Sequence, residues 1–120
     1  MRGYLTTHVL DTAQGRPAAG VVIELWRLNA DGSQGDRLVS VRTNADGRTE
    51  APLLAGPDFR PGFYELVFHT GAYFAGQQVP LADPPFLDQI PVRFSVATAG
   101  ASYHVPLLVS PWAYSTYRGS

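Results

Sequence analysis

The chain has 120 residues, of which 45% are hydrophobic and 16% are charged. This size and composition exclude a disordered chain and are typical of one folded domain, which we expect to span residues 1–120. A formal net charge of -1, with no run of basic residues, argues against a surface for nucleic acid or an anionic membrane.

Short β-rich runs bounded by Gly, Pro and Asp recur along the chain, and no helical periodicity persists long enough to predict a long helix. The pattern predicts an all-β sandwich. We expect strands near 4–11, 20–28, 37–44, 48–51, 62–69, 91–97, 102–110 and 113–118.

The connections between these runs carry turn signals. Asp31-Gly32 and Asp46-Gly47 predict hairpin turns, with Arg48 beginning the next strand. The connection from Thr70 to Ile90 contains an Ala-Tyr-Phe-Ala run and then several prolines, which predicts one short helix followed by an extended segment.

The N-terminal segment gives no sign of a secretory signal, because polar Thr6, Thr7 and His8 interrupt it before an apolar run forms. No stretch approaches the roughly 20 apolar residues of a membrane span. The chain has no cysteine, which agrees with a reducing compartment. We therefore expect a cytoplasmic protein.

Side chains alternate between the two faces of a strand, so the pattern predicts which residues face the core. Two rows are suited to the core: Leu5, Thr7 and Val9, and Tyr103, Val105, Leu107 and Val109. The rows opposite them are Thr6, His8 and Leu10, and His104, Pro106 and Leu108. These outward rows are too apolar for a freely solvated surface, which suggests burial against another subunit.

Pro106 is at odds with this assignment, since proline cannot donate to a sheet ladder and is typical of edges and bulges.

The three histidines, His8, His69 and His104, are candidates for proton transfer near neutral pH. For His69, whose face partners are Glu65 and Val67, the pattern favours a structural role. For His8 and His104 the pattern alone leaves structural and functional roles open.

A zinc site is the rival interpretation, with Asp11 as a carboxylate ligand beside the imidazoles. The spacing argues against it, because no His-x-His or His-Glu-x-x-His pair exists and Asp11 lies on the strand face opposite His8. The motifs of serine hydrolases, P-loop proteins and dinucleotide-binding folds have no match either.

Several segments together resemble one known family nearly end to end: Leu5–Thr12, Gly15–Ala18, Thr43–Arg48, Phe68-His69, Pro84–Asp88, Tyr103–Pro111 and Tyr114–Ser120. They are similar to the transthyretin-like 5-hydroxyisourate hydrolases.

The resemblance implies a prealbumin-like sandwich of two four-stranded sheets with one short helix, assembled as a homotetramer whose inter-subunit channel holds the active sites. It implies a small-molecule substrate, 5-hydroxyisourate, hydrolysed at a ring amide to 2-oxo-4-hydroxy-4-carboxy-5-ureidoimidazoline in urate degradation. It implies no cofactor and no metal.

The family's catalytic residues fall on His8, Arg48 and His104, and its C-terminal tetrapeptide falls on Tyr117, Arg118, Gly119 and Ser120 as substrate-binding residues. A histidine suits activation of water, and an arginine suits either polarisation of the attacked carbonyl or binding of the anionic ring. Which histidine acts as the base stays open.

One departure from the family pattern is Ser102, which stands where members often carry a histidine before the Tyr-His pair. Two other functions stay open. A transthyretin-like carrier of a hormone or small ligand would share the fold without catalysis, and a plain β-sandwich interaction module would leave the outward histidines unexplained.

Overall fold

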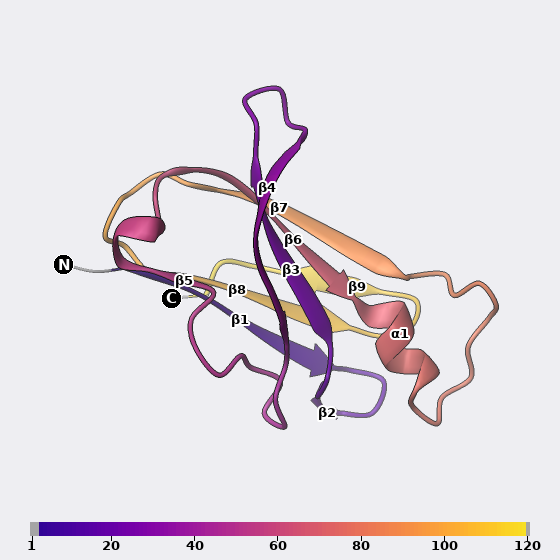
Figure 1. Cartoon of the computed structure of the whole chain (residues 1–120). Helices are drawn as coiled ribbons and strands as arrows, with labels where there is room; N and C mark the ends of the chain where they lie inside the picture. Colours follow the sequence, from indigo (N-terminus) through magenta and orange to yellow (C-terminus); the bar gives the residue numbers. More distant parts are fainter. Residues whose placement is uncertain (1–2, 120) are drawn as a thin grey trace.

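The computed structural model describes residues 3–119, which form two packed β-sheets (Figure 1). The first sheet contains, in spatial order, β2 (Arg16–Pro17), β1 (Tyr4–Asp11), β8 (Tyr103–Val109) and β9 (Tyr114–Thr116), with β5 (Leu54–Ala55) paired to the start of β1. The second sheet contains β4 (Gln34–Arg42), β3 (Val22–Leu28), β6 (Gly62–His69) and β7 (Gln89–Val96). The predicted all-β sandwich is confirmed.

The core lies between the sheets and is built from the alternating apolar side of each strand. The two rows predicted to face it, which begin at Leu5 and at Tyr103, are buried throughout. From the second sheet they meet side chains such as Ile23, Leu25, Tyr64, Leu66 and Phe68, each with no exposed surface. Full burial of one such side chain stabilises the fold by about 1.5–3 kcal/mol, so this alternation holds the two sheets together.

One predicted strand is wrong. Residues 48–51 form no strand, and Arg48 lies in a bend instead. The chain folds back on itself here, because the N–H of Asn44 donates to the Arg48 carbonyl at 2.7 Å and the Asn44 side chain accepts the Arg48 N–H at 3.2 Å. Two short strands, β2 and β5, were not predicted, and they make the first sheet five-stranded rather than four-stranded.

The turn predicted at Asp31-Gly32 and the short helix are confirmed, but the hairpin predicted at Asp46-Gly47 is wrong, because no strand begins at Arg48. Gly32, with a φ of 87°, lies in the turn that joins β3 to β4, and this turn projects beyond the sheets in Figure 1. A short helix, α1 (Thr70–Ala75), follows β6 directly, and a 3-10 helix, η1 (Gly56–Asp58), lies between β5 and β6. Over the part of the chain that the structure describes, no helix is long and apolar enough to cross a membrane.

Pro106 lies in β8, an interior strand, but at a break in one of its ladders. The β8–β9 pairing runs from Val109 to Leu107 and resumes only at the isolated bridge between His104 and Gly119. The Pro106 carbonyl accepts the Thr116 hydroxyl at 2.7 Å. A proline is tolerated here because the neighbouring ladder is interrupted beside it.

Candidate active site

The two histidines predicted to face outward lie on the two neighbouring strands at the centre of the first sheet. β1 and β8 run parallel, with Thr6 opposite His104 and His8 opposite Pro106. Both imidazoles are therefore on the outer face of this sheet, two register positions apart, and both residues are half-buried. The Thr6 hydroxyl lies 2.8 Å from Nδ1 of His104.

Arg48 reaches this face from a loop that lies along the edge of β1. The loop passes between β2 and β5, and its Gly47 carbonyl accepts the Val9 N–H at 2.8 Å. Gly47 has a φ of 75°, and a β-carbon there would lie 2.4 Å from the Val9 carbonyl oxygen, so only glycine fits. This close approach fixes the next residue, Arg48, with its side chain exposed beside β1.

The same loop determines which nitrogen of His8 carries a proton. Nε2 of His8 lies 2.9 Å from the backbone carbonyl of Asp46. A carbonyl only accepts hydrogen bonds, so Nε2 of His8 donates to it and carries hydrogen whether the ring is neutral or charged. Nδ1 is then the nitrogen of His8 that is left for exchange of a proton.

The surroundings of His104 favour its neutral form. Burial lowers the pKa of His104 below the ordinary histidine value of 6.5, and the nearby positive charges of Arg48 and His8 lower it further. Arg48 and His8 both change the pKa of His104, so the three predicted catalytic residues form one electrostatic cluster. A neutral imidazole at neutral pH is suited to accept a proton.

The C-terminal segment closes one side of this cluster. The N–H of Gly119 donates to the His104 carbonyl at 2.7 Å. The Arg118 guanidinium lies 3.9 Å from the centroid of the Tyr103 ring and donates to the Ser102 carbonyl at 3.3 Å, which anchors the segment to β8. Ser120 lies outside the described residues.

Tyr117, which precedes this anchor, is 59% exposed and lines a cavity of about 200 Å³ at the sandwich edge.

His69 lies on the second sheet, apart from this cluster. Its Nε2 lies 2.6 Å from Oε2 of Glu24, and the other oxygen of that carboxylate, Oε1, accepts a hydrogen bond from the Trp26 indole at 3.0 Å. These contacts agree with the structural role that the sequence pattern favours for His69. Among residues 3–119 no group of three histidine or acidic side chains is arranged to hold a metal ion.

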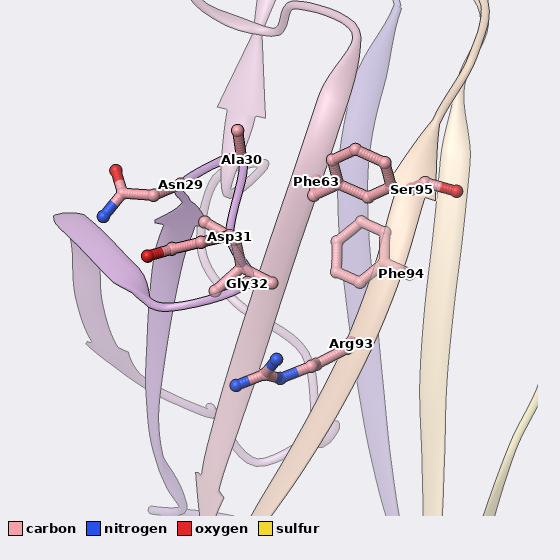
Figure 2. Close-up of a pocket in the computed structure, with 9 residues that line it drawn as sticks. Asn29, Ala30, Asp31, Gly32, Phe63, Arg93, Phe94 and Ser95 are labelled. Carbon is pink, nitrogen blue, oxygen red and sulfur yellow. The ribbon is translucent and has the colours of Figure 1, made fainter.

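A cavity of about 430 Å³ also lies on the second sheet, beside the turn between β3 and β4. Figure 2 shows Phe63 and Phe94 on one side of it, with Arg93 below and Asp31 across from them. Its lining includes neither Arg48 nor any histidine, so it is separate from the cluster on the first sheet.

Sequence reasoning missed two groups at the site, the Thr6 hydroxyl and the Asp46 carbonyl. Thr6 is on the predicted outward row, but its partner depends on the pairing of β1 with β8, which the alternation of one strand does not reveal. The Asp46 carbonyl belongs to the backbone, and residue types carry no signal for it.

The chain is a two-sheet β-sandwich with two histidines and an arginine near one another at the outer face of one sheet. The family model described as the HIUase/Transthyretin family matches residues 5–119. The chain belongs to this family, and the resemblance found from sequence motifs is confirmed.

Relatives span most of the chain. It is 61% identical over 118 residues to a 5-hydroxyisourate hydrolase of Mesorhizobium japonicum, covering 98% of this chain and 93% of that protein. The structure of an (S)-allantoin synthase is similar with a TM-score of 0.92 and 48% identity, covering 99% of this chain but only 44% of that one. Transthyretin from Sparus aurata is similar with a TM-score of 0.83 and 29% identity, covering 96% of this chain and 95% of that one.

Proposed function

We propose that this protein is an enzyme of urate degradation that hydrolyses 5-hydroxyisourate to 2-oxo-4-hydroxy-4-carboxy-5-ureidoimidazoline. The observation that carries the proposal is the gathering of His8, His104 and Arg48 on one sheet face, with the pKa of His104 lowered. The 61% identity to a protein named 5-hydroxyisourate hydrolase supports the choice of substrate.

Hydrolysis of a ring amide needs a base for water and positive charge for the developing oxyanion. In our proposal His104 accepts a proton from water as the water oxygen bonds to the ring carbonyl carbon. The carbon–nitrogen bond then breaks, and the proton passes from His104 to the leaving nitrogen. Arg48 stabilises the oxyanion or holds the anionic ring through its planar fork of N–H donors.

His8 has a supporting part in this proposal. Its Nε2 donates a hydrogen bond to the Asp46 carbonyl, so His8 ties the Arg48 loop to β1. A ring anchored in this way is suited to orient the substrate. We also propose that the C-terminal tetrapeptide, Tyr117, Arg118, Gly119 and Ser120, binds the substrate.

The decisive experiment adds the protein to freshly generated 5-hydroxyisourate and follows its ultraviolet absorbance. We expect decay much faster than the spontaneous rate, with the His104→Ala variant as the matched control. Decay at the spontaneous rate with the unsubstituted protein would refute the proposal.

The alternative function is that of a transthyretin-like carrier. The 29% identity to Sparus aurata transthyretin supports this alternative. A carrier would bind a small ligand at this face and leave it unchanged. Catalysis is favoured here because a pair of histidines beside an arginine supplies proton transfer, which a carrier does not need. Stoichiometric binding of 5-hydroxyisourate without turnover would favour the carrier.

We also propose that the protein is a homotetramer with its active sites in the channel between subunits. Large side chains are exposed near the end of the first sheet, with Trp112 at 60%, Tyr114 at 45% and Tyr117 at 59%. Exposed apolar surface of this kind is typical of interfaces. Light scattering should give four times the mass of the chain, and a monomer at micromolar concentration would contradict the assembly.

The proposed location is the cytoplasm. The absence of cysteine supports it, because disulfides are typical of oxidising compartments. Fractionation of the source cells, with activity as the readout, tests the location.

A further inference from the structure

Thr6 and Thr7 are neighbours on β1, yet their hydroxyls have different partners. The Thr7 side chain is buried on the core face and donates to the Val105 carbonyl at 2.8 Å. The Thr6 side chain is on the outer face, half-buried, and its Oγ1 lies 2.8 Å from Nδ1 of His104. One hydroxyl therefore supports the backbone of β8, and the other supports a side chain of the candidate site.

The direction of the Thr6 hydrogen bond follows from what the ring must do. A threonine hydroxyl donates or accepts, so with neutral His104 both directions are chemically allowed. The imidazolium form carries hydrogen on both nitrogens, so Nδ1 then donates to Thr6. If Nδ1–H of His104 donates to Thr6 in the neutral ring as well, the hydrogen bond keeps the same direction when the ring gains and loses a proton at Nε2. If Thr6 donated to the neutral ring, its hydroxyl would have to turn each time.

We propose that Thr6 is a positioning residue that accepts the Nδ1–H of His104, so that Nε2 is the nitrogen that takes the proton from water. This inference rests on the proposed function. It gives the two histidines opposite tautomers, because the Asp46 carbonyl fixes the hydrogen of His8 on Nε2. The outer face of the sheet thus presents a bare Nε2 at His104 and a bare Nδ1 at neutral His8.

Thr6 is the residue whose side chain lies within hydrogen-bond distance of Nδ1 of His104, and the other neighbours of the ring approach it elsewhere. Among the described residues the charged or titratable groups that act on this ring are Arg48 from the loop and His8 from β1. The terminal segment contributes the backbone of Gly119, which packs against the ring. A β-carbon added at Gly119 would lie 2.6 Å from Cδ2 of His104. The ring is therefore held by its neighbours on one side and by the Thr6 hydroxyl at Nδ1.

The test compares Thr6→Val, which keeps the shape and removes the hydroxyl, with Thr6→Ser, which keeps the hydroxyl. We expect kcat of Thr6→Val to fall by about 10- to 100-fold with little change in KM, and Thr6→Ser to recover most of it. Thr7→Val is the matched control, since it removes a hydroxyl from the same strand, and its kcat should change by less than about threefold.

The pH profile reports the direction of the bond. A hydroxyl that accepts from Nδ1–H stabilises the imidazolium, so its loss lowers the pKa of His104 and moves the acid limb of kcat/KM to lower pH, by about one unit. A limb that moves to higher pH would mean that Thr6 donates, which overturns the proposal. An unmoved limb would make Thr6 merely structural and would overturn it equally.

Nitrogen NMR of the ring tests the inference without any turnover. In the unsubstituted protein neutral His104 should carry its hydrogen on Nδ1, and in Thr6→Val the Nε2–H form should increase. An Nε2–H tautomer in the unsubstituted protein refutes the inference even if the enzyme is active. Conversely, the Nδ1–H tautomer in a protein without hydrolase activity would refute the proposed function and leave the contact as assigned.

Discussion

The backbone of Gly119 packs against the imidazole of His104 so closely that a β-carbon at position 119 would lie 2.6 Å from Cδ2 of the ring. Real β-carbons essentially never approach another atom this closely, so any side chain at position 119 has to displace the ring or the terminal segment. The Gly119 N–H also donates to the His104 carbonyl at 2.7 Å. The glycine of the terminal tetrapeptide is thus explained by the space that His104 needs.

We therefore expect Gly119→Ala to lower kcat/KM by about 10-fold or more while the melting temperature hardly changes, since small displacements of catalytic groups are costly. Gly76→Ala is the matched control, because the nearest atom to a β-carbon there is at an ordinary 3.5 Å and its φ is -87°. Steady-state kinetics and thermal unfolding of both variants check this. Unchanged kinetics in Gly119→Ala would show that the terminal segment does not restrain the ring.

Replacement of Arg48 or His104 by alanine should each lower turnover by about 10²–10⁴-fold, because the loss of a positioned acid–base group or oxyanion donor has effects of this size. His8→Ala should also lower turnover, by about 10²-fold, because the substrate loses the ring that orients it. His69→Ala is the control from the other sheet, where the ring pairs with Glu24 at 2.6 Å. It should keep its turnover and lose about 0.5–1.5 kcal/mol of stability. A residue whose alanine variant turns over normally has no part in the mechanism.

The acid limb of kcat/KM should lie below pH 6.5. Burial, Arg48 and His8 each lower the pKa of His104, so the ring stays neutral to lower pH than an ordinary histidine. Arg48→Gln removes one positive charge and should raise that pKa, as followed by NMR titration of the ring. Arg93→Gln on β7 removes a charge from the other sheet and should leave the titration unchanged. A pKa of His104 that falls in Arg48→Gln would contradict the electrostatic cluster.

The buried Asp11 carboxylate accepts hydrogen bonds from the Tyr73 hydroxyl at 2.8 Å and from the Gln14 side chain at 2.7 Å. Burial alone would raise the pKa of Asp11, but the hydrogen bonds from Gln14 and Tyr73 outweigh it and lower that pKa below 3.8. Burial and the Asp11 carboxylate raise the pKa of Tyr73 to about 12.

The signs of these shifts give the pH window. The contribution of Asp11 to stability is present above pH 3.8 and is lost as pH falls through its lowered pKa, whereas that of Tyr73 is present below pH 10 and is lost as pH rises toward about 12. Asp11→Asn should therefore cost about 1–3 kcal/mol in urea unfolding at pH 7 and less at pH 3. Tyr73→Phe should cost about 1–2 kcal/mol, and Tyr4→Phe, at an exposed position, almost nothing. An equal cost of Asp11→Asn at both pH values would contradict the lowered pKa.

Strand alternation predicted most of the sandwich because one face of each strand must cover the core. It placed His8 and His104 opposite the buried rows that begin at Leu5 and Tyr103, as the structure has them. Alternation failed where the backbone, rather than side-chain burial, determines the path. The bend at Arg48 depends on hydrogen bonds of Asn44, and the contact of Thr6 with His104 depends on a parallel pairing between distant segments.

The pairing of β1 with β8 also bears on how the protein is made. Thr6 and His104 are 98 positions apart in the chain, so the contact between them forms only after nearly all of the chain has left the ribosome. Contacts this distant in sequence close slowly, because the loop entropy is lost before the pairing stabilises it. During synthesis β1 therefore lacks its neighbour β8 until nearly the whole chain is made, and the candidate site cannot form on an incomplete chain.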